Sequence, residues 1–176
     1  MSVPTETKEQ QIARFLRVNQ AGELGAVRIY QGQRAVLGKG RHGPLLEHMT
    51  KQEQHHLDTF NRLIAERRVR PTALSPLWNV AGFVLGAGTA LLGERAAMAC
   101  TVAVEEAIDE HYADQAASLG EDESALKATI EQFRAEELEH RDIGLANEAE
   151  KAPAYPLLSG AIKTGCKFAI WLSERV

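Results

Sequence analysis

The chain has 176 residues, of which 44% are hydrophobic and 25% are charged, so we expect one domain with a sizeable core over residues 1–176. The formal net charge is −4 and the pI is about 5.9, so charge gives no reason to expect a nucleic-acid partner. Cys100 and Cys166 lie far apart and in no C-x-x-C pattern, which favours buried free thiols over a zinc ribbon or a disulfide framework.

Helical periodicity dominates the chain, and strong strand signals are missing from the sequence. Pro44 suits the first turn of a helix, whereas Pro71 and Pro76 bracket an extended crossover. Pro153 and Pro156 stop a later helix. The expected helical pieces are residues 7–37, 44–68, an apolar segment over 77–92 that leads into a helix to about 119, then 121–151 and 157–175. We therefore predict an all-α fold, a ferritin-like four-helix bundle with a long crossover and two additional helical elements.

Two Glu-x-x-His pairs carry the strongest functional signal in the chain, and a lone glutamate precedes each pair at a similar distance. In chain order the six residues are Glu23, Glu53, His56, Glu105, Glu137 and His140. One lone glutamate stands 30 residues before its pair and the other 32, while 52 residues separate Glu53 from Glu105. Two antiparallel helical hairpins joined by one long crossover would produce this spacing. It is the ligand pattern of a carboxylate-bridged two-metal site inside a four-helix bundle.

Helix geometry narrows the choice of ligands, because residues three or four apart share one face of a helix. Glu105 lies on an apolar face, whereas Glu106 lies with Glu110 on a more polar one, so we favour Glu105. In the second pair, the helix angle alone leaves both Glu136 and Glu137 open. The three-residue spacing of the first pair favours Glu137. A carboxylate in an apolar stripe is unfavourable unless it is paired or bound to a metal, and this supports the metal interpretation.

The donor set also indicates the metal. Four carboxylates and two imidazoles suit iron or manganese better than a closed zinc site, and we predict two iron ions per chain. Tyr30 and Tyr112 each follow a lone glutamate by seven residues, about two helical turns, which suggests two related halves. Core tyrosines with satisfied hydroxyls are the ordinary interpretation, with Tyr112 kept as a catalytic candidate. The other histidines are interpreted as surface residues: His42, His48, His55 and His111.

No charged residue occurs from Pro71 to Gly93, and this length of apolar sequence resembles a membrane span. A span would place Glu53 and Glu105 on opposite sides of a bilayer, so we expect a packed or interfacial helix instead. The C-terminal helix resembles an amphipathic helix lying on a membrane surface, although both segments could be core helices. The candidates for a membrane-facing surface are Trp78, Phe83, Leu85, Phe168 and Trp171, with Lys163 and Lys167 available for anionic headgroups.

Five stretches of sequence provide evidence beyond the spacing of the candidate ligands. They are residues 17–33 (RVNQAGELGAVRIYQGQ), 69–93 (VRPTALSPLWNVAGFVLGAGTALLG), 99–106 (ACTVAVEE), 136–144 (EELEHRDIG) and 152–176 (APAYPLLSGAIKTGCKFAIWLSERV). Together they closely resemble the demethoxyubiquinone hydroxylase family. The resemblance covers nearly the whole chain after about Ala13, and it places the family's metal ligands on the six residues named above.

The resemblance implies a di-iron monooxygenase that hydroxylates the quinone ring of demethoxyubiquinone in ubiquinone biosynthesis. O2 would be the co-substrate, and NADH would supply reducing equivalents directly or through a reductase. The implied partners are a prenylated quinone, a membrane surface and other ubiquinone-biosynthesis proteins, and assembly into a homo-oligomer stays open. The family is peripheral to the membrane, on the cytoplasmic face in bacteria or the matrix side of the inner mitochondrial membrane in eukaryotes. We expect the bacterial setting, because no presequence is visible.

Two other functions would use the same ligands. An iron-storage or peroxidase protein of the ferritin class would not need the uncharged segment and would hold many irons per chain. A membrane-associated quinol oxidase would consume the quinol without oxygenating it. Iron stoichiometry and the fate of the lipid substrate separate these alternatives from the hydroxylase.

Overall fold

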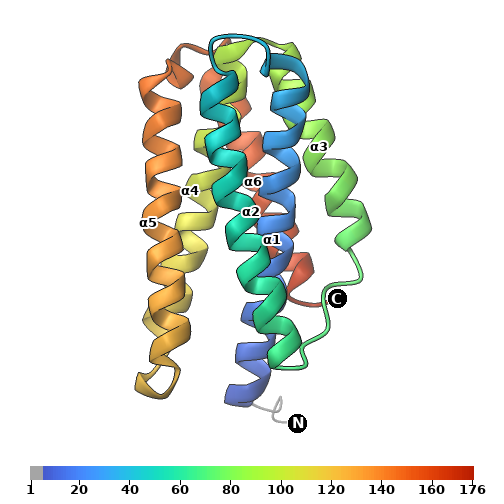
Figure 1. The fold of residues 1–176 in the computed structure, drawn as a ribbon, viewed down its shortest axis with the longest axis vertical. Coiled ribbons are helices and arrows are strands. Elements are labelled where there is room, and N and C mark those ends of the chain that lie inside the picture. Colours follow the sequence, from blue (N-terminus) through green and yellow to red (C-terminus); the bar gives the residue numbers. More distant parts are fainter. Residues whose placement is uncertain (1–5) are drawn as a thin grey trace.

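The computed structural model describes residues 6–176, which form six α-helices and two short 3₁₀ turns and contain no β-strand. In chain order, the elements are α1 (Lys8–Leu37), α2 (Gly43–Glu66), α3 (Ser75–Leu91), α4 (Glu94–Ser118), η1 (Glu121–Glu123), α5 (Ser124–Ala146), η2 (Ala149–Lys151) and α6 (Tyr155–Ser173). Helices α1, α2, α4 and α5 form the bundle, while α3 packs on α1 and α6 packs on α4 (Figure 1). The predicted ferritin-like bundle with two additional helices is confirmed.

Local sequence sets the helix boundaries. Thr7 and Gln10 form a capping box at the start of α1, each side chain bonding the other residue's backbone N–H. Gly93 separates α3 from α4. Its φ of 116° breaks the helix, and glycine occupies this position because residues with a side chain rarely adopt such a backbone conformation. The predicted helix over 121–151 is shorter in the structure: α5 ends at Ala146, and Glu148 turns the chain with a left-handed backbone before η2.

The crossover helix α3 packs against α1 at very short range, because glycines stand on both sides of the contact. A Cβ on Gly86 would run into the carbonyl oxygen of Ile29, and one on Gly32 would run into the carbonyl oxygen of Phe83. Gly82 meets the carbonyl oxygen of Gly25 in the same way. The glycines of the uncharged segment therefore let two backbones approach each other closely.

The core consists of two apolar clusters along the bundle axis. One cluster contains Phe15, Phe60 and Tyr112, and the other contains Tyr30 and Met98. Helix α1 contributes Ile12, Phe15 and Leu16 before Glu23, and Ile29 and Tyr30 after it, so apolar core residues flank Glu23 along the helix. The bundle thus places apolar packing on both sides of the predicted site.

Exposed apolar side chains line the outer faces of α3 and α6, but they differ in part from the candidates above. Phe168 and Trp171 are exposed as predicted, with stacked rings 5.9 Å apart. The exposed residues of α3 are instead Leu77, Val80, Val84 and Leu91. Phe83 is half-buried and its ring lies under Arg28, while Trp78 and Leu85 face a cavity described below. Within residues 6–176, no helix is both long and apolar enough to cross a membrane.

The lysines proposed for lipid headgroups already have carboxylate partners. Lys163 of α6 pairs with Glu106 and Glu110 of α4 at 3.2 and 2.6 Å, and Lys167 pairs with Glu110 at 2.6 Å. Their positive charge is therefore largely compensated by α4. These pairs also confirm that Glu106 lies on the polar face of its helix.

Candidate metal centre

Helices α1, α2, α4 and α5 bring the six predicted ligands together in the middle of the bundle. All six are at most 1% exposed, which is unusual for glutamate. They are Glu23 of α1, Glu53 and His56 of α2, Glu105 of α4, and Glu137 and His140 of α5. Each bundle helix therefore contributes in the pattern expected from the spacing.

The cluster divides into two overlapping sets of potential ligands. In one set, the ligand atoms of Glu23, Glu53, His56 and Glu137 all lie within 4.8 Å of one another, and in the other those of Glu53, Glu105, Glu137 and His140 do. Glu53 and Glu137 belong to both sets, so their carboxylates stand where they could bridge two ions. Each remaining residue belongs to one set only, which gives each position one further glutamate and one histidine.

The donor atoms converge without satisfying one another. Nδ1 of His140 lies 2.9 Å from a carboxylate oxygen of Glu53, and Nδ1 of His56 lies 3.1 Å from one of Glu137. Neither nitrogen has a hydrogen-bonding partner of acceptable geometry, and both oxygens of Glu53 and of Glu137 also lack one. Buried polar atoms are normally satisfied, so these orphaned atoms fit a site for metal ions. Two divalent cations would balance the charge of four carboxylates.

The other ring nitrogen of each histidine contacts the opposite helix. Nε2 of His56 lies 2.7 Å from Oε2 of Glu136, and Nε2 of His140 lies 3.0 Å from Oε1 of Gln52. Glu136 therefore contacts the far side of a histidine and is absent from both ligand sets, whereas Glu137 belongs to each. The structure therefore favours Glu137 over Glu136 as the candidate metal ligand, a choice that the helix angle alone left open.

The side chains of the two tyrosines each form a hydrogen bond with a glutamate of the other helical hairpin. The hydroxyl of Tyr30 donates to Glu105, and the hydroxyl of Tyr112 donates to Glu23. Each tyrosine therefore lies seven residues after the lone glutamate of its own helix and hydrogen bonds to the lone glutamate of the opposite hairpin. Both side chains are almost completely buried, and both hydroxyls are satisfied.

Burial and mutual repulsion shift the proton affinities in the metal-free cluster. Burial, together with the negative charges of Glu137 and Glu53, raises the pKa of Glu105 well above its usual range. Burial alone would lower the pKa of His140, but the neighbouring carboxylates of Glu137 and Glu53 outweigh it and raise the pKa to about 10. Without metal, the cluster therefore retains protons at neutral pH.

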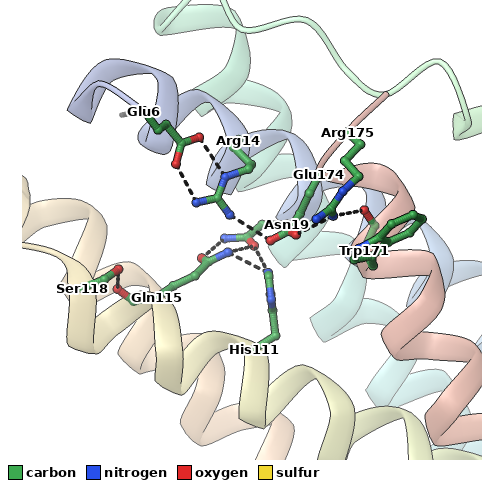
Figure 2. Close-up of polar contacts among 9 residues, drawn as sticks. All are labelled: Glu6, Arg14, Asn19, His111, Gln115, Ser118, Trp171, Glu174 and Arg175. Carbon is green, nitrogen blue, oxygen red and sulfur yellow. Dashed lines mark hydrogen bonds and ion pairs between the residues drawn. The ribbon is translucent and has the colours of Figure 1, made fainter. Parts of the chain in front are cut away.

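A polar network that the sequence does not reveal joins Asn19 of α1 to His111 and Gln115 of α4 (Figure 2). The amides of Asn19 and Gln115 exchange two hydrogen bonds of 2.8 and 2.9 Å, and Nε2 of His111 lies 3.2 Å from Oδ1 of Asn19. His111 was interpreted as a surface residue, yet it is half-buried against these amides. The interpretation of His42 is also wrong, because it is 4% exposed between Glu94 and Asn147.

An apolar cavity of about 390 Å³ lies between α1, α3, α4 and α6, and none of the six candidate ligands lines it. Gly22 and Val104, which line it, are the chain neighbours of Glu23 and Glu105. Two of the lining residues, Trp78 of α3 and Ser173 of α6, are joined by a 2.9 Å hydrogen bond that the indole N–H donates to the serine hydroxyl. The cavity thus connects the face that carries the exposed apolar residues with the helices that carry two of the ligands. Its size and lining suit an apolar chain.

Comparison with known proteins agrees with this geometry. A model of the family described as "Ubiquinone biosynthesis protein COQ7" matches residues 10–173. A Rhodospirillum rubrum protein named 3-demethoxyubiquinol 3-hydroxylase is 69% identical over 94% of this chain and 78% of its own. The human NADPH-dependent 3-demethoxyubiquinone 3-hydroxylase is 56% identical over the same shares. The 5-demethoxyubiquinone hydroxylase of Saccharomyces cerevisiae is 45% identical over 93% of this chain and 77% of its own. The buried Glu/His cluster thus belongs to a chain that is a member of the COQ7 family of ubiquinone biosynthesis proteins.

Proposed function

We propose that this protein is a di-iron monooxygenase that hydroxylates the ring of demethoxyubiquinone or its quinol in ubiquinone biosynthesis. The observation that carries the proposal is a fully buried cluster of four glutamates and two histidines, in a bundle whose helices α1 and α4 also line an apolar cavity. The names of the relatives, which specify the hydroxylation of demethoxyubiquinol or demethoxyubiquinone, supply the substrate.

In this proposal, two irons would be held by the two ligand sets, with Glu53 and Glu137 available to both, Glu23 and His56 available to one iron, and Glu105 and His140 to the other. When bound, the irons supply the electrons that activate O2. One oxygen atom enters a ring C–H bond to give C–OH, and the other leaves as water with two electrons and two protons from the reductant. The surrounding apolar clusters exclude water from this chemistry.

Tyr112 has a positioning role in this scheme. Its hydroxyl donates to Glu23, so it fixes the orientation of that carboxylate, and Tyr30 does the same for Glu105. We keep Tyr112 as the candidate for a further part in substrate or electron handling, because the polar network of Asn19, Gln115 and His111 adjoins its helix turn. Replacing Tyr112 with Phe should then slow turnover without loss of bound iron.

The apolar cavity is the proposed site of the prenyl tail. Small residues from α1 and α6 leave its volume open, and the exposed apolar faces of α3 and α6 flank it. A lipid-dissolved substrate could thus pass from a membrane surface into the bundle while the protein stays peripheral to that membrane. The setting is the cytoplasmic face of a bacterial membrane or the matrix side of the inner mitochondrial membrane, where partner proteins of the pathway would meet it.

The reductant is a reduced nicotinamide in this proposal. NADH was the expectation from the sequence, whereas the names of the bovine and human relatives specify NADPH. Stopped-flow oxidation of NADH and of NADPH by the iron-loaded protein, with and without quinone substrate, would identify the donor.

Mass spectrometry of lipid extracts tests the proposed function in cells. A strain that lacks this protein should accumulate demethoxyubiquinone and recover ubiquinone when the wild-type gene is returned. Normal ubiquinone in the deletion strain would contradict the proposal.

Iron stoichiometry separates the hydroxylase from a storage protein. Six ligands can satisfy about two ions and no mineral core, so iron-loaded protein should hold about two irons per chain. Many irons per chain would favour storage. Quinol consumption without an oxygenated product would favour a quinol oxidase.

A further inference from the structure

The residue immediately before each bridging glutamate reaches across the bundle to the histidine of the other pair. Gln52 precedes Glu53 on α2 and contacts His140 of α5. Glu136 precedes Glu137 on α5 and contacts His56 of α2. The two halves thus use the same position for the same task. One half carries an amide there and the other carries a carboxylate.

This difference acts on the ligand nitrogens through the imidazole rings. Nδ1 of each histidine faces the cluster, so Nε2 carries the ring N–H and donates it outward. A charged acceptor makes a stronger hydrogen bond than a neutral one and leaves the imidazole a more basic ligand. Nε2 of His56 lies 2.7 Å from Glu136, whereas Nε2 of His140 lies 3.0 Å from Gln52. His56 is therefore the stronger metal ligand of the two histidines.

The carboxylate is held in place for this contact. The side-chain amide of Gln132, one turn earlier on α5, donates a 3.0 Å hydrogen bond to Oε1 of Glu136, which leaves Oε2 for His56. The side chain of Glu136 is 24% exposed, so its charge is only partly hydrated. Phe133 stacks on the His56 ring at a centroid distance of 3.9 Å and fixes the plane of that ring. Contacts with neighbouring residues therefore fix both the orientation of the His56 ring and the position of the carboxylate that accepts its hydrogen bond.

We propose that Glu136 and Gln52 make the two metal positions unequal, so that the position with His56 binds metal more tightly and fills first. This inference rests on the two-metal site proposed above and assigns positioning roles to two residues outside the ligand set. The inequality arises chiefly from the residue before each shared glutamate, which is Gln52 in one half and Glu136 in the other.

Metal titration of the chelator-treated protein under anaerobic conditions tests the inference. Wild-type protein should bind Fe²⁺ in two steps of one ion each, with dissociation constants about tenfold or more apart. Glu136→Gln removes the charge and keeps the shape, so it should weaken the first step by about 10–100-fold and bring the two steps together. Gln52→Glu should tighten the second step. Glu139→Gln, which removes an exposed charge from the same helix, should leave both steps unchanged.

Mössbauer spectra provide a readout that a merely structural role would not change. One equivalent of iron-57 followed by one of ordinary iron should label a single position in the wild type and give one quadrupole doublet. In the exchanged variant, Gln52→Glu with Glu136→Gln, the same order of addition should label the other position and give the other doublet.

The outcomes distinguish this inference from the proposed function. Two irons bound with equal affinity in the wild type, or equal effects of Glu136→Gln and Glu139→Gln, would overturn the inference and leave the two-metal site standing. Fewer than two irons per chain would contradict the proposed function itself. If Glu136→Gln does not fold, Gln52→Glu decides the matter, since an unchanged second step would overturn the inference.

Discussion

Four glutamates are buried close together in this protein, and that arrangement is unfavourable without compensating positive charge. Each of these glutamates is at most 1% exposed, and six of their eight carboxylate oxygens have no hydrogen-bond donor. Tyr30 and Tyr112 supply one donor each to the two glutamates that are not shared between the ligand sets. The shared glutamates, Glu53 and Glu137, receive none. Metal ions are the compensation that this distribution of donors fits best.

Replacing Glu105 with alanine should remove metal and activity, whereas replacing Glu106 should preserve both. Glu105 faces the cluster, but Glu106 reaches outward to Lys163 of α6. We expect Glu105→Ala to lose roughly half or more of its iron and Glu106→Ala to retain nearly all of it. Inductively coupled plasma analysis of the two purified variants is the measurement. Equal losses of iron would contradict the assigned faces of α4.

The stabilisation that iron provides should grow as pH rises from about 6 to 9. The metal-free folded state holds extra protons, because the pKa of Glu105 lies above its ordinary 4.5 and that of His140 is raised from 6.5 to about 10. Stability from both groups is full at low pH and falls as pH rises through those values. Bound metal takes the place of the protons on Glu105 and His140, so the iron-loaded protein does not lose this stability as the pH rises.

Thermal unfolding of chelated and iron-loaded protein at each pH measures the effect. The difference in Tm should widen toward pH 9. A difference that stays constant or narrows would contradict the account of the cluster.

The sequence identifies the candidate ligands that the structure brings together, but it says little about their surroundings, for a physical reason. Glutamate and histidine on an apolar helix face stand out, because few interactions other than metal binding compensate for their burial. Gln52 and Asn19 do not stand out, since amides are common on exposed helix faces, and only the packing of a second helix shows that they are half-buried or buried. His111 and His42 were misassigned in the same way. The choice between Glu136 and Glu137 also needed the neighbouring helix.

At the scale of the element, α3 depends on glycine more than on its apolar side chains. Its backbone lies directly against α1 at Gly82 and Gly86, where any Cβ would meet a carbonyl oxygen. That close contact holds α3 beside the cavity, to which it contributes Trp78 and Leu85. The sequence shows these glycines, but only the structure shows that α1 is the helix they contact.

Gly86→Ala should destabilise the protein, whereas Gly88→Ala should not. The added methyl group on Gly86 would push α3 away from Ile29, at a cost of about 1–3 kcal/mol. Nothing lies within 4 Å of a Cβ on Gly88, so alanine there should gain about 0.5–1 kcal/mol from helix propensity. Urea unfolding curves of both variants are the measurement. Equal stability of the two variants would contradict the packing described here.

The outer face of α3 is the better place to test membrane contact than the residues first expected from the sequence. Val80 and Val84 are 62% and 61% exposed and lie outside the cavity lining, so Val80→Asp with Val84→Asp should leave the fold and the metal content intact. We expect this double variant to detach from phospholipid vesicles and to hydroxylate a long-tailed quinone slowly. A short-tailed, water-soluble quinone should react at nearly the wild-type rate.

A matched variant controls for the added charge. Ala125 and Ala128 are exposed on α5, and the same two aspartates there should affect neither vesicle binding nor rate. Vesicle flotation and turnover with both quinones give the comparison. Equal slowing with long and short tails would show that the face of α3 supports the fold and is not an entrance.

At the scale of the whole molecule, two helical hairpins, α1–α2 and α4–α5, enclose the Glu/His cluster, and α3 and α6 pack on the outside of this bundle (Figure 1). The spacing predicts this architecture, since the intervals of 30 and 32 residues each match one hairpin and the interval of 52 residues matches the crossover between them. The break at Gly93 and the early end of α5 were not predicted, because backbone conformation at a single residue decides them. The cavity also depends on tertiary packing, since four separate helices line it.

The central claim is that the cluster and the cavity act together to oxygenate a prenylated quinol, and labelled oxygen tests it most directly. Purified iron-loaded protein in vesicles would be supplied with a demethoxyubiquinol, a reduced nicotinamide and ¹⁸O₂, and the lipid would be analysed by mass spectrometry. The account predicts one labelled oxygen atom on the quinone ring for each turnover, and none with Glu105→Ala. A product without the label, or quinol oxidised with no oxygen added, would contradict it.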